Sequence, residues 1–501
     1  MLTLGAQSLT LADLEAASEP VKVVVPGPTR TRLQNCRDYV TALANTDRPV
    51  YGSTTGFGPM VVFSGREAPE EQLDNCLAHL SAGQGPDLPL EVVRAAMLVR
   101  AHSLCQGRSG VSPQGVDALV GALGTSFTPA VPRFGSLGAS GDLIPLAAVA
   151  SALQGRSHAA AYVDGHRMPA DEALQRAGLE PMQLIDGRDG LGMVNGTSVT
   201  VAAAGLALAS LRRSRKVAVM LSGLLADILG AADTFTDARL LEAYGHAGPQ
   251  IVGREMRALL AALEPSGKRN LQEPYSVRCV PHLVGACEDS LAHAQQIIDT
   301  DLQSVSDNPL FFDEDDHVAH GGNFFGQPVA FASDLCTIAA TQLANLAERQ
   351  LDLLMDPNRN TGLNPMLASK PGRQHGIQGV QLAATSITAD MRRTSTPASM
   401  QSLPTNWHNQ DVIPFGTQAA LNSLEHAESL RLLHGSLGVA LRQAVHVGGR
   451  EPTAPVCAAV LAELTKAIAP IDPDRPLSND VRRAADTLDE TIDRIPARVA
   501  P

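Results

Sequence analysis

The sequence predicts a mainly α-helical protein, in which a looped, glycine-rich N-terminal part precedes a bundle of long helices. Five windows of helix-forming residues extend over four turns or more, and period-two alternation is scarce. Glycine and proline concentrate in the first third of the chain and in three later stretches. With 501 residues, 44% of them hydrophobic, the chain is long enough for one large helical core or for about two to four ordinary domains.

The individual helices are predicted from apolar residues that recur three and four positions apart, such as Leu343, Leu346 and Leu354. The short stretch Tyr162–Gly165 indicates at most a small hairpin. We expect a first domain over residues 1–190 and a central helical bundle with C-terminal helices over 191–501. Alanine-rich helices of this length often pack across subunits, so we also expect an oligomer. The five helical windows are Val217–Ala232, Pro281–Ser304, Gln327–Met355, Gly376–Arg393 and Thr417–Val447.

Charge and cysteine usage exclude several classes of protein. Lys and Arg number 39 and Asp and Glu 52, so the net charge of −13 argues against a nucleic-acid partner. Seven scattered cysteines without a CxxC pair favour a reducing cytoplasm over a disulfide or zinc framework. The N-terminus lacks a basic region before an apolar run, so no signal peptide is expected.

One uncharged segment, Gly190–Leu211, is as long as a membrane-spanning helix. It contains Asn195, Thr197 and Ser198, and it is rich in alanine rather than in leucine or isoleucine. We therefore expect a buried helix of a soluble protein, with no membrane partner.

Most familiar catalytic motifs are absent. The glycines of Gly52–Gly58 have neither dinucleotide-binding nor P-loop spacing, and Ser140 is not in a GxSxG elbow. His282 and His293 share a predicted helix, but a rise of about 16 Å is too long for one metal ion. His317 and His320 lie in a glycine- and aspartate-rich loop. We expect no metal.

The tripeptide Ala139-Ser140-Gly141 could carry unusual chemistry. Its three small residues, flanked by Gly138, allow a tight bend. Attack of the Gly141 nitrogen on the Ala139 carbonyl carbon would close a five-membered ring, and loss of water, including the Ser140 hydroxyl, would leave an electrophilic methylidene group. From spacing alone, a plain glycine-rich turn is the more common explanation.

A series of motifs then changes this interpretation, because the segment Gly135–Leu146 resembles the signature of the aromatic amino-acid ammonia-lyases. Further motifs follow in the order of that family, and the resemblance extends over the chain from about residue 20 onward. The motifs are Val50-Tyr-Gly-Ser-Thr-Thr-Gly-Phe-Gly58, Val194-Asn-Gly-Thr197, Gln272-Glu-Pro-Tyr-Ser-Val-Arg-Cys279, Asp307-Asn-Pro309, His320-Gly-Gly-Asn-Phe324, Leu346-Ala-Glu-Arg-Gln350 and Asn409-Gln-Asp411.

The resemblance implies a fumarase/aspartase-like helical architecture and a prosthetic group, 4-methylidene-imidazol-5-one (MIO), formed from Ala139, Ser140 and Gly141 without any metal. It implies a homotetramer whose active sites are shared between subunits. Several helix N-termini would point at the site and stabilise developing negative charge. The substrate would be a small aromatic amino acid.

The resemblance also assigns roles to single residues. Tyr51 would be the base, and its pKa must fall from about 10 for it to act at neutral pH. Tyr275 would assist proton handling, and Arg278 would bind the substrate carboxylate. Asn195 and Gln272 resemble amides that hold the prosthetic oxygen or the substrate. Phe324 resembles the aromatic residue that shields the ring, and the remaining substrate-binding candidates are Gly58, Leu143, Asn308, Asn406 and Gln410.

Substrate choice in this family follows a residue pair, which reads His79-Leu80 when aligned on Ser81–Gly85. At this pair, tyrosine lyases typically have His-Leu, phenylalanine lyases have Phe-Leu and histidine lyases have Ser-His. An imidazole can hydrogen-bond a para-hydroxyl group, which favours tyrosine. A one-residue slip to Ala78-His79 would be closer to the histidine pattern. Gln410 stands where histidine lyases typically have a Glu that would meet the substrate imidazole. Because Gln is neutral, it disfavours histidine as the substrate.

The sequence therefore predicts a tyrosine ammonia-lyase that produces trans-p-coumarate. Phenylalanine and histidine lyases stay open, as does a tyrosine 2,3-aminomutase, although Phe57 favours a lyase. Pro414 and Phe415 depart from the residues that many relatives have after the late loop, and Trp407 is an unusual neighbour for a pocket edge. A bundle without catalytic activity is disfavoured because Tyr51 and Ser140 are intact.

Overall fold

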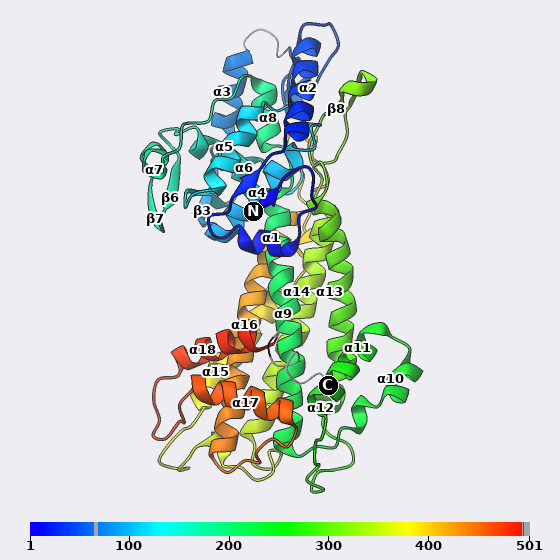
Figure 1. The fold of residues 1–501 in the computed structure, drawn as a ribbon, viewed down its shortest axis with the longest axis vertical. Coiled ribbons are helices and arrows are strands. Elements are labelled where there is room, and N and C mark those ends of the chain that lie inside the picture. The colour runs from blue at the N-terminus through cyan, green and yellow to red at the C-terminus, as the bar shows by residue number, and fades with distance from the viewer. Residues whose placement is uncertain (65–68, 493, 495–501) are drawn as a thin grey trace. The chain divides into compact units, whose positions relative to one another are not determined.

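The computed structural model describes residues 1–64, 69–492 and 494 (Figure 1). The mainly α-helical fold class is confirmed, and the predicted window Gln327–Met355 matches a helix at both ends. The helices are α1 Leu11–Ala16, α2 Gly27–Ala44, α3 Pro69–Leu80, α4 Leu90–Leu104, α5 Pro113–Leu123, α6 Leu143–Leu153, α7 Ala170–Ala177, α8 Gly187–Val194, α9 Ser198–Leu229, α10 Ala238–Tyr244, α11 Ala247–Leu259, α12 Tyr275–Arg278, α13 Val280–Leu302, α14 Gln327–Met355, α15 Gln378–Thr394, α16 Gly416–His446, α17 Pro455–Ala467 and α18 Ser478–Thr491.

Strands are short and form small sheets in the part of the chain that the structure describes. β6 pairs antiparallel with both β4 and β7, and the β6–β7 hairpin confirms the turn predicted near Tyr162–Gly165. β3 pairs with β5 and β8 with β9, both antiparallel, while β1 and β2 are parallel. The strands are β1 Leu2–Thr3, β2 Val23–Val24, β3 Gln84–Asp87, β4 Thr128–Pro129, β5 Pro132–Phe134, β6 Ala160–Val163, β7 His166–Pro169, β8 Leu310–Phe312 and β9 His317–Ala319.

The chain folds into two compact units, and each unit is made of three segments. Unit 1 comprises Met1–Ala207, Gln295–Asp334 and Pro397–Leu421, and unit 2 comprises Leu208–Ala294, Leu335–Thr396 and Asn422–Pro501. Four of the boundaries fall inside α9, α13, α14 and α16, because single long helices contribute to both units. Two consecutive domains, 1–190 and 191–501, stay a prediction.

Unit 1 is more helical than the sequence predicted for a looped N-terminal part. The prediction missed α4, in which the whole stretch Val92–Leu104 is buried, because a helix without an exposed face has no amphipathic pattern. Its buried Arg94 is satisfied by backbone groups, since it donates to the carbonyl oxygens of Ala17, Leu123 and Thr125 at 2.7, 2.9 and 2.9 Å. Glycine and proline were therefore misleading guides to loops here.

A small apolar cluster in unit 1 joins three segments that lie far apart in sequence. Val40 of α2, Val50, Phe311 of β8 and Val318 of β9 are all buried in it, together with Cys36 and Leu43. Val50 immediately precedes the predicted base, and β9 immediately precedes the motif at 320–324. The cluster thus places these two motifs next to each other.

The uncharged segment Gly190–Leu211 is not one continuous helix. It contains the end of α8 and the first half of α9, and the chain leaves helical conformation at Asn195. The burial expected for it is confirmed, since residues 190–209 are all buried. The prediction for Val217–Ala232 captured only the second half of α9.

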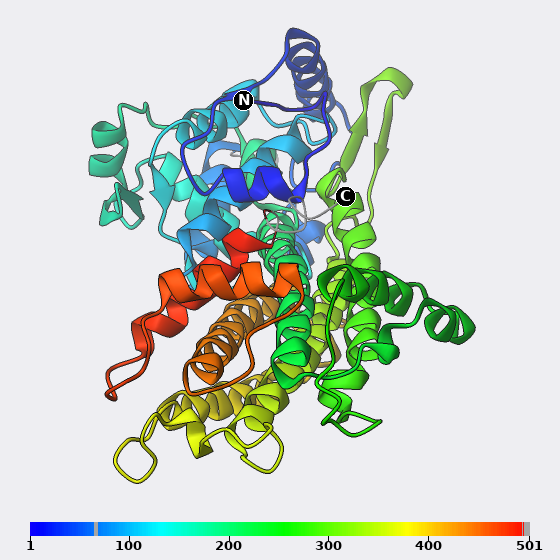
Figure 2. The same ribbon diagram turned by 60° about the horizontal axis from the view of Figure 1, so that its bottom comes forward.

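In unit 2, α9, α13 and α14 pack together (Figure 1). Arg212 of α9 donates to Glu288 of α13 at 2.8 Å, and Gln350 of α14 donates to Ser222 Oγ of α9 at 2.8 Å. Helices α17 and α18 also lie side by side (Figure 2). By length and composition alone α14 could cross a membrane, but 72% of its most apolar window is buried.

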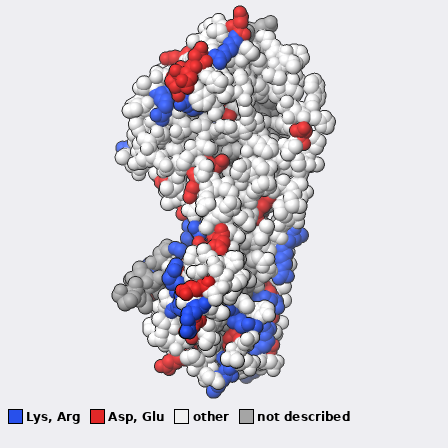
Figure 3. Space-filling view, turned by 90° about the vertical axis from the view of Figure 1, so that its right-hand side faces the viewer, with Lys and Arg blue, Asp and Glu red and all other residues white. Residues whose placement is uncertain are grey.

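The surface carries charges of both signs. On the face shown in Figure 3, basic and acidic side chains are interspersed and separated by wide uncharged areas. Such mixing gives no extended basic stripe on this face for a nucleic-acid backbone.

Candidate active site

The tripeptide Ala139-Ser140-Gly141 lies between β5 and α6 in unit 1 and is held by close backbone contacts. Gly141 has a φ of +70°, and a Cβ atom there would lie 2.3 to 2.5 Å from backbone atoms of Gly196. The Gly141 N–H donates to the carbonyl oxygen of Phe324 at 3.0 Å, and Gly141 forms an isolated parallel bridge with Gly196. Only glycine satisfies both the conformation and the approach.

Asp142 is the main anchor of this turn, and sequence reasoning did not select it. Its carboxylate does not cap its own helix, α6, but accepts from the N–H groups of Val199 and Thr200 at 2.8 and 2.9 Å, at the start of α9. The hydroxyl groups of Ser136, Thr200 and Thr417 lie 2.7, 2.7 and 2.8 Å from the same carboxylate. The signal in the sequence that could have identified Asp142 is a carboxylate directly after a turn of small residues.

Four helices begin around this turn. α6 starts directly after Asp142, and α9 is capped by that residue. The N–H of Gly326, which precedes α14, donates to the Gly138 carbonyl oxygen at 3.1 Å. α16 contributes Thr417 at its first turn. Four positive helix ends therefore surround residues 138–142, as the resemblance implied.

The predicted late loop also reaches the tripeptide. Gln410 Nε2 donates to Ser140 Oγ, and backbone hydrogen bonds between Thr405 and Gln410 at 3.0 and 3.3 Å close the loop. Asn406, Trp407 and His408 all have positive φ values, of 52°, 54° and 59°. Three consecutive non-glycine residues in this conformation are strained, which is typical of functional loops. Asn406 and Trp407 are exposed.

Asn195 and Phe324 lie beside the tripeptide through their backbones. Asn195 follows α8 and directly precedes Gly196, the partner of Gly141. Its side chain is 3% exposed, yet its Oδ1 has no hydrogen-bond partner among the described residues. This buried amide oxygen beside the tripeptide is therefore placed to accept a hydrogen bond from a bound molecule.

Tyr51 lies in a tight turn of unit 1 and is anchored at two atoms. Its phenol oxygen accepts from the Gly58 N–H at 2.7 Å, and its own N–H donates to His320 Nε2 at 3.2 Å. Burial raises the pKa of Tyr51, while the Gly58 N–H and the charge of Arg188 act in the opposite direction. The pKa therefore lies above the ordinary value, whereas the sequence argument required a lowered one.

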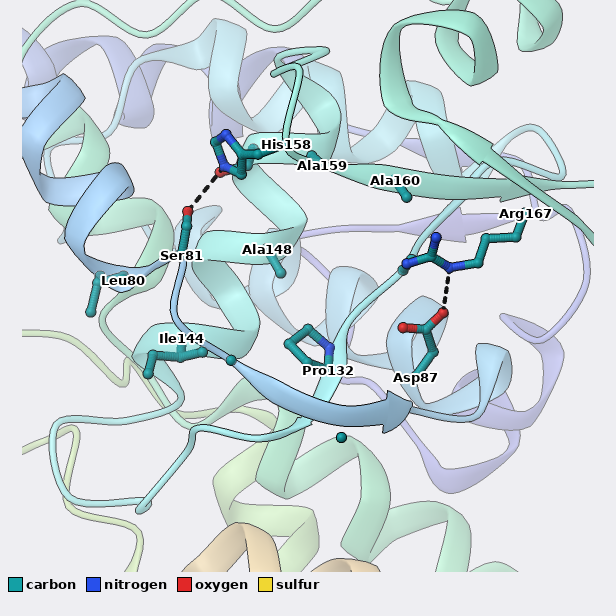
Figure 4. Close-up of a pocket in the computed structure, with 14 residues that line it drawn as sticks. Leu80, Ser81, Asp87, Pro132, Ile144, Ala148, His158, Ala159, Ala160 and Arg167 are labelled. Atoms are coloured by element: carbon teal, nitrogen blue, oxygen red, sulfur yellow. Dashed lines mark hydrogen bonds and ion pairs between the residues drawn. The ribbon is translucent and has the colours of Figure 1, made fainter.

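The specificity pair lies at the end of α3. His79 is exposed, and its Nδ1 lies 2.8 Å from the Asn75 carbonyl oxygen. Leu80 is buried and lines a cavity of about 260 Å³ with Pro132 and Ile144 (Figure 4). None of the other predicted site residues lines that cavity. Leu143 is half-buried at the first position of α6.

Asn308 belongs to a buried ionic network. Its Oδ1 accepts from the Gly321 N–H at 2.8 Å, and its carbonyl oxygen accepts from Arg188 Nη1 at 3.1 Å. Arg188 and Asp307 form an ion pair whose side chains are both 0% exposed. This pairing holds the Asp307-Asn308-Pro309 motif, and it also was not predicted from the sequence.

The remaining predicted residues, Gln272, Tyr275 and Arg278, belong to unit 2. Tyr275 is 71% exposed, and the Arg278 guanidinium carbon lies 4.7 Å from its ring centroid. Arg278 Nε donates to the Glu273 carbonyl oxygen at 2.8 Å, and no described residue accepts a hydrogen bond from its Nη atoms. Gln272 is exposed. This segment presents a cation and a phenol to solvent.

A sequence model of the family described as aromatic amino acid lyase matches residues 9–466. The chain belongs to the aromatic amino acid lyase family. Relatives of this chain are named ammonia-lyases, which are carbon–nitrogen lyases. A histidine ammonia-lyase from Symbiobacterium thermophilum is 35% identical over 97% of this chain and 96% of its own length. A tyrosine ammonia-lyase from Cupriavidus metallidurans is 36% identical over 93% and 91% of the two chains.

Solved structures place this lyase in the same fold. The crystal structure of a tyrosine aminomutase from Streptomyces globisporus has a TM-score of 0.92 and 32% identity, and the match covers 99% of this chain and 98% of the other. The ammonia-lyase architecture predicted from the motifs is confirmed by this match.

The residues around the tripeptide fit the MIO group for which the family is known. Ala139, Ser140 and Gly141 would supply the atoms of the ring, and Gly138 and Gly141 adopt positive φ values of 64° and 70°. The four helix N-termini are suited to a group that gains negative charge. The Oδ1 of Asn195, which has no partner among the described residues, can accept a hydrogen bond from a bound substrate. Within the described residues, no cluster of three or more His, Cys, Asp or Glu could hold a metal ion.

Proposed function

We propose that this lyase eliminates ammonia from L-tyrosine and releases trans-p-coumarate. The main support for tyrosine is the contact of His79 Nδ1 with the Asn75 carbonyl oxygen. A carbonyl oxygen can only accept, so the Asn75 carbonyl requires the proton of the neutral imidazole on Nδ1. Nε2 is then a bare acceptor, which is complementary to the O–H of a phenol. Phenylalanine has no such donor and would leave Nε2 unpaired.

The prosthetic group of this proposal is MIO, formed from Ala139, Ser140 and Gly141. It would supply an electrophile that turns the substrate amine into a good leaving group. Asn195 Oδ1 and Gln410 Nε2 would orient the tripeptide or the substrate next to it.

Tyr51 would remove the β-proton at its phenol oxygen. The Gly58 N–H, which donates to that oxygen at 2.7 Å, stabilises the phenolate and aims it. Arg278 would bind the substrate carboxylate through its two free Nη atoms, and Tyr275 stacks against it. Phe324 would cover the ring, and Gly58, Leu80, Leu143, Gln272, Asn308 and Asn406 would complete the pocket.

We infer that the working enzyme is a homotetramer in which several copies complete each site. The 71% exposure of Tyr275 supports this, because a catalytic phenol needs a shielded environment. A cytoplasmic location is part of the same proposal.

A tyrosine 2,3-aminomutase is the second candidate, and the TM-score of 0.92 to a tyrosine aminomutase favours it. It would return the ammonia to the β-carbon and yield β-tyrosine. The histidine ammonia-lyase relative keeps histidine as a third substrate to test, although the neutral Gln410 does not favour it.

The test is to mix purified protein separately with tyrosine, phenylalanine and histidine. Near-UV absorbance reports coumarate, an ammonia assay reports elimination, and chromatography reports β-tyrosine. Coumarate from tyrosine supports the proposal. Ammonia from phenylalanine or histidine alone would contradict the substrate, and β-tyrosine without coumarate would favour the mutase.

A variant sharpens the substrate assignment. His79→Phe should shift the ratio of kcat/KM for tyrosine over phenylalanine by about ten-fold or more towards phenylalanine, because the phenol loses its acceptor. The matched control is His166→Phe, since the Nδ1 of His166 makes the same kind of local contact, 2.9 Å from the Asp164 carbonyl oxygen. Unchanged selectivity in His79→Phe would show that His79 lies outside the pocket.

A further inference from the structure

His320 makes a contact that the proposed mechanism does not use. It follows β9, and its Nε2 accepts the backbone N–H of Tyr51 at 3.2 Å, across 269 residues of sequence. A backbone N–H can only donate, so Nε2 must carry a lone pair. This bond therefore exists only with the neutral imidazole protonated on Nδ1.

The residues next to His320 are held to the core of unit 1. The Gly321 N–H donates to Asn308 Oδ1 at 2.8 Å, and Asn308 is bound in turn by Arg188 at 3.1 Å. Arg188 is paired with Asp307, and both side chains are 0% exposed. On the other side, Phe311 and Val318 anchor the β8–β9 hairpin in the apolar cluster. His320 is therefore attached to a rigid support.

The turn that carries Tyr51 is closed by local hydrogen bonds, in which the N–H groups of Ser53 and Thr54 donate to the Val50 carbonyl oxygen at 3.1 and 2.9 Å. Val50 is buried in the same cluster, and its N–H donates to Thr54 Oγ1 at 2.7 Å. Beyond that, the Tyr51 residue itself is held by Gly58 at the phenol oxygen and by His320 at the backbone. The His320 bond thus fixes the backbone atom adjacent to the Cα that carries the phenol.

We propose that His320 is a positioning residue for Tyr51, which holds the base in place as a neutral acceptor and releases its backbone N–H when protonated. The catalytic consequence rests on the proposed function, because it takes Tyr51 as the base. The positioning itself does not depend on the substrate.

The surrounding charges keep His320 in the accepting form. Burial and the charges of Arg48 and Arg188 lower the pKa of His320 below its ordinary value. Arg48 comes from the segment before Val50 and is paired with Asp316, in the turn between β8 and β9, at 3.3 Å. Arg188 comes from α8 and is paired with Asp307, and the Tyr51 N–H contacts His320 directly. Release is therefore confined to acidic pH.

Amide hydrogen exchange in the full chain tests the positioning directly. The variants are His320→Leu, which removes the acceptor, and His320→Gln, whose Oε1 can accept near the position of Nε2 but does not titrate. After division by the intrinsic rates, exchange of the Tyr51 amide at pH 7.5 should be about five-fold faster in His320→Leu than in the wild type, and near wild type in His320→Gln. His317→Gln, on the same hairpin, is the control and should match the wild type.

The pH dependence separates this role from general support of the fold. Between pH 7.5 and pH 5, the corrected exchange of the Tyr51 amide should accelerate in the wild type and stay constant in His320→Gln. Equal exchange in the wild type and His320→Leu, or the same acidic acceleration in His320→Gln, would overturn the proposal. If His320→Leu does not fold, the comparison of wild type with His320→Gln decides alone.

Kinetics then test the consequence for catalysis. At neutral pH, kcat of His320→Gln for the accepted aromatic amino acid should equal the wild-type value. On acidification, kcat should fall less in His320→Gln than in the wild type. A protein that releases no product from any aromatic amino acid, but shows the expected exchange pattern, would contradict the proposed function and leave the positioning role standing. An active lyase in which the His320 variants leave the exchange of the Tyr51 amide unchanged would contradict the positioning role and leave the proposed function standing.

Discussion

The two segments that carry the predicted catalytic groups are built in opposite ways. Around residues 138–142 in unit 1, small residues are buried, and Asp142 accepts from the start of α9 and from three hydroxyl groups. Around residues 272–278 in unit 2, Tyr275 is 71% exposed and Arg278 has unpaired Nη atoms among the described residues.

This difference shows where preorganisation is already complete. The buried turn satisfies its polar groups within unit 1, so changes to the residues that anchor it, such as Gly141 and Asp142, should affect folding and chemistry together. In the Tyr275–Arg278 segment, the Arg278 Nη atoms have no partner among the described residues, so changes to that guanidinium group should affect binding while leaving stability nearly unchanged. The substitutions below test this division.

Ser140→Ala should have the largest effect. The Ser140 hydroxyl would leave during formation of the proposed prosthetic group, so its removal should reduce activity by at least about 10³-fold. The fold should persist, because among the described residues the Ser140 hydroxyl group is hydrogen-bonded only by Gln410. Coumarate release and thermal unfolding measure the two outcomes, with Ser18→Ala, which removes only a local hydrogen bond to Glu15, as the control. Full activity in Ser140→Ala would contradict the proposal that Ala139, Ser140 and Gly141 form the prosthetic group.

Gly141→Ala should come next, through a steric clash. A Cβ at Gly141 would lie 2.3 Å from the Gly196 carbonyl oxygen, while Gly267 in unit 2 has a similar φ of +68° with no atom within 4 Å. Gly267→Ala should reduce the free energy of unfolding by about 1 kcal/mol, the conformational penalty alone. Gly141→Ala should reduce it by about 3 kcal/mol or more. Urea denaturation of the two variants gives the difference, and equal losses would refute the close packing of this turn.

Arg278→Lys should impair binding with little change in stability. A lysine cannot make the bidentate contact with a carboxylate, so KM should rise about ten-fold or more with a smaller change in kcat. The matched variant is Arg269→Lys, because Arg269 is bound to Glu273 in a structural ion pair. It should lower stability and leave KM near wild type. Steady-state kinetics with thermal unfolding check both, and a KM effect in Arg269→Lys alone would reverse the assignment.

Asp301→Asn should give a smaller effect that depends on pH. Burial, together with the charge of Asp142, raises the pKa of Asp301 to about 6 from 3.8 in spite of the Thr197 hydrogen bond. The contribution of Asp301 to stability is therefore present below pH 3.8 and lost as the pH rises through about 6. After allowance for its partial exposure, the variant should be more stable than wild type by about 1 kcal/mol at pH 8.

The pH series decides this last prediction. At pH 4 the Asp301→Asn variant should match the wild type, because the native carboxyl group is then protonated in the folded state. Asp289→Asn, which removes an exposed carboxylate of the same helix α13, is the control for the loss of one negative charge. A variant less stable than wild type at pH 8 would mean that the Asp301 charge is favourable.

Local sequence patterns predicted the parts of the fold that local physics controls. The bounds of α14 followed from its apolar periodicity, and the hairpin of β6 and β7 followed from its turn residues. Periodicity failed where burial is complete, as in α4, and where two helices meet without a charged residue between them, as at Asn195. In both places the pattern lacks the polar face or the boundary on which such predictions depend.

By itself, the sequence determined the helical fold class, the family motifs and the chemical identity of the tripeptide. Only the tertiary structure decided that Asp142 caps α9 instead of its own helix, that Gln410 reaches Ser140, and that His320 holds Tyr51. The last two contacts join residues 270 and 269 positions apart. Local propensity carries no information about such pairings, because they are fixed by how helices pack and by which buried polar groups must find a partner.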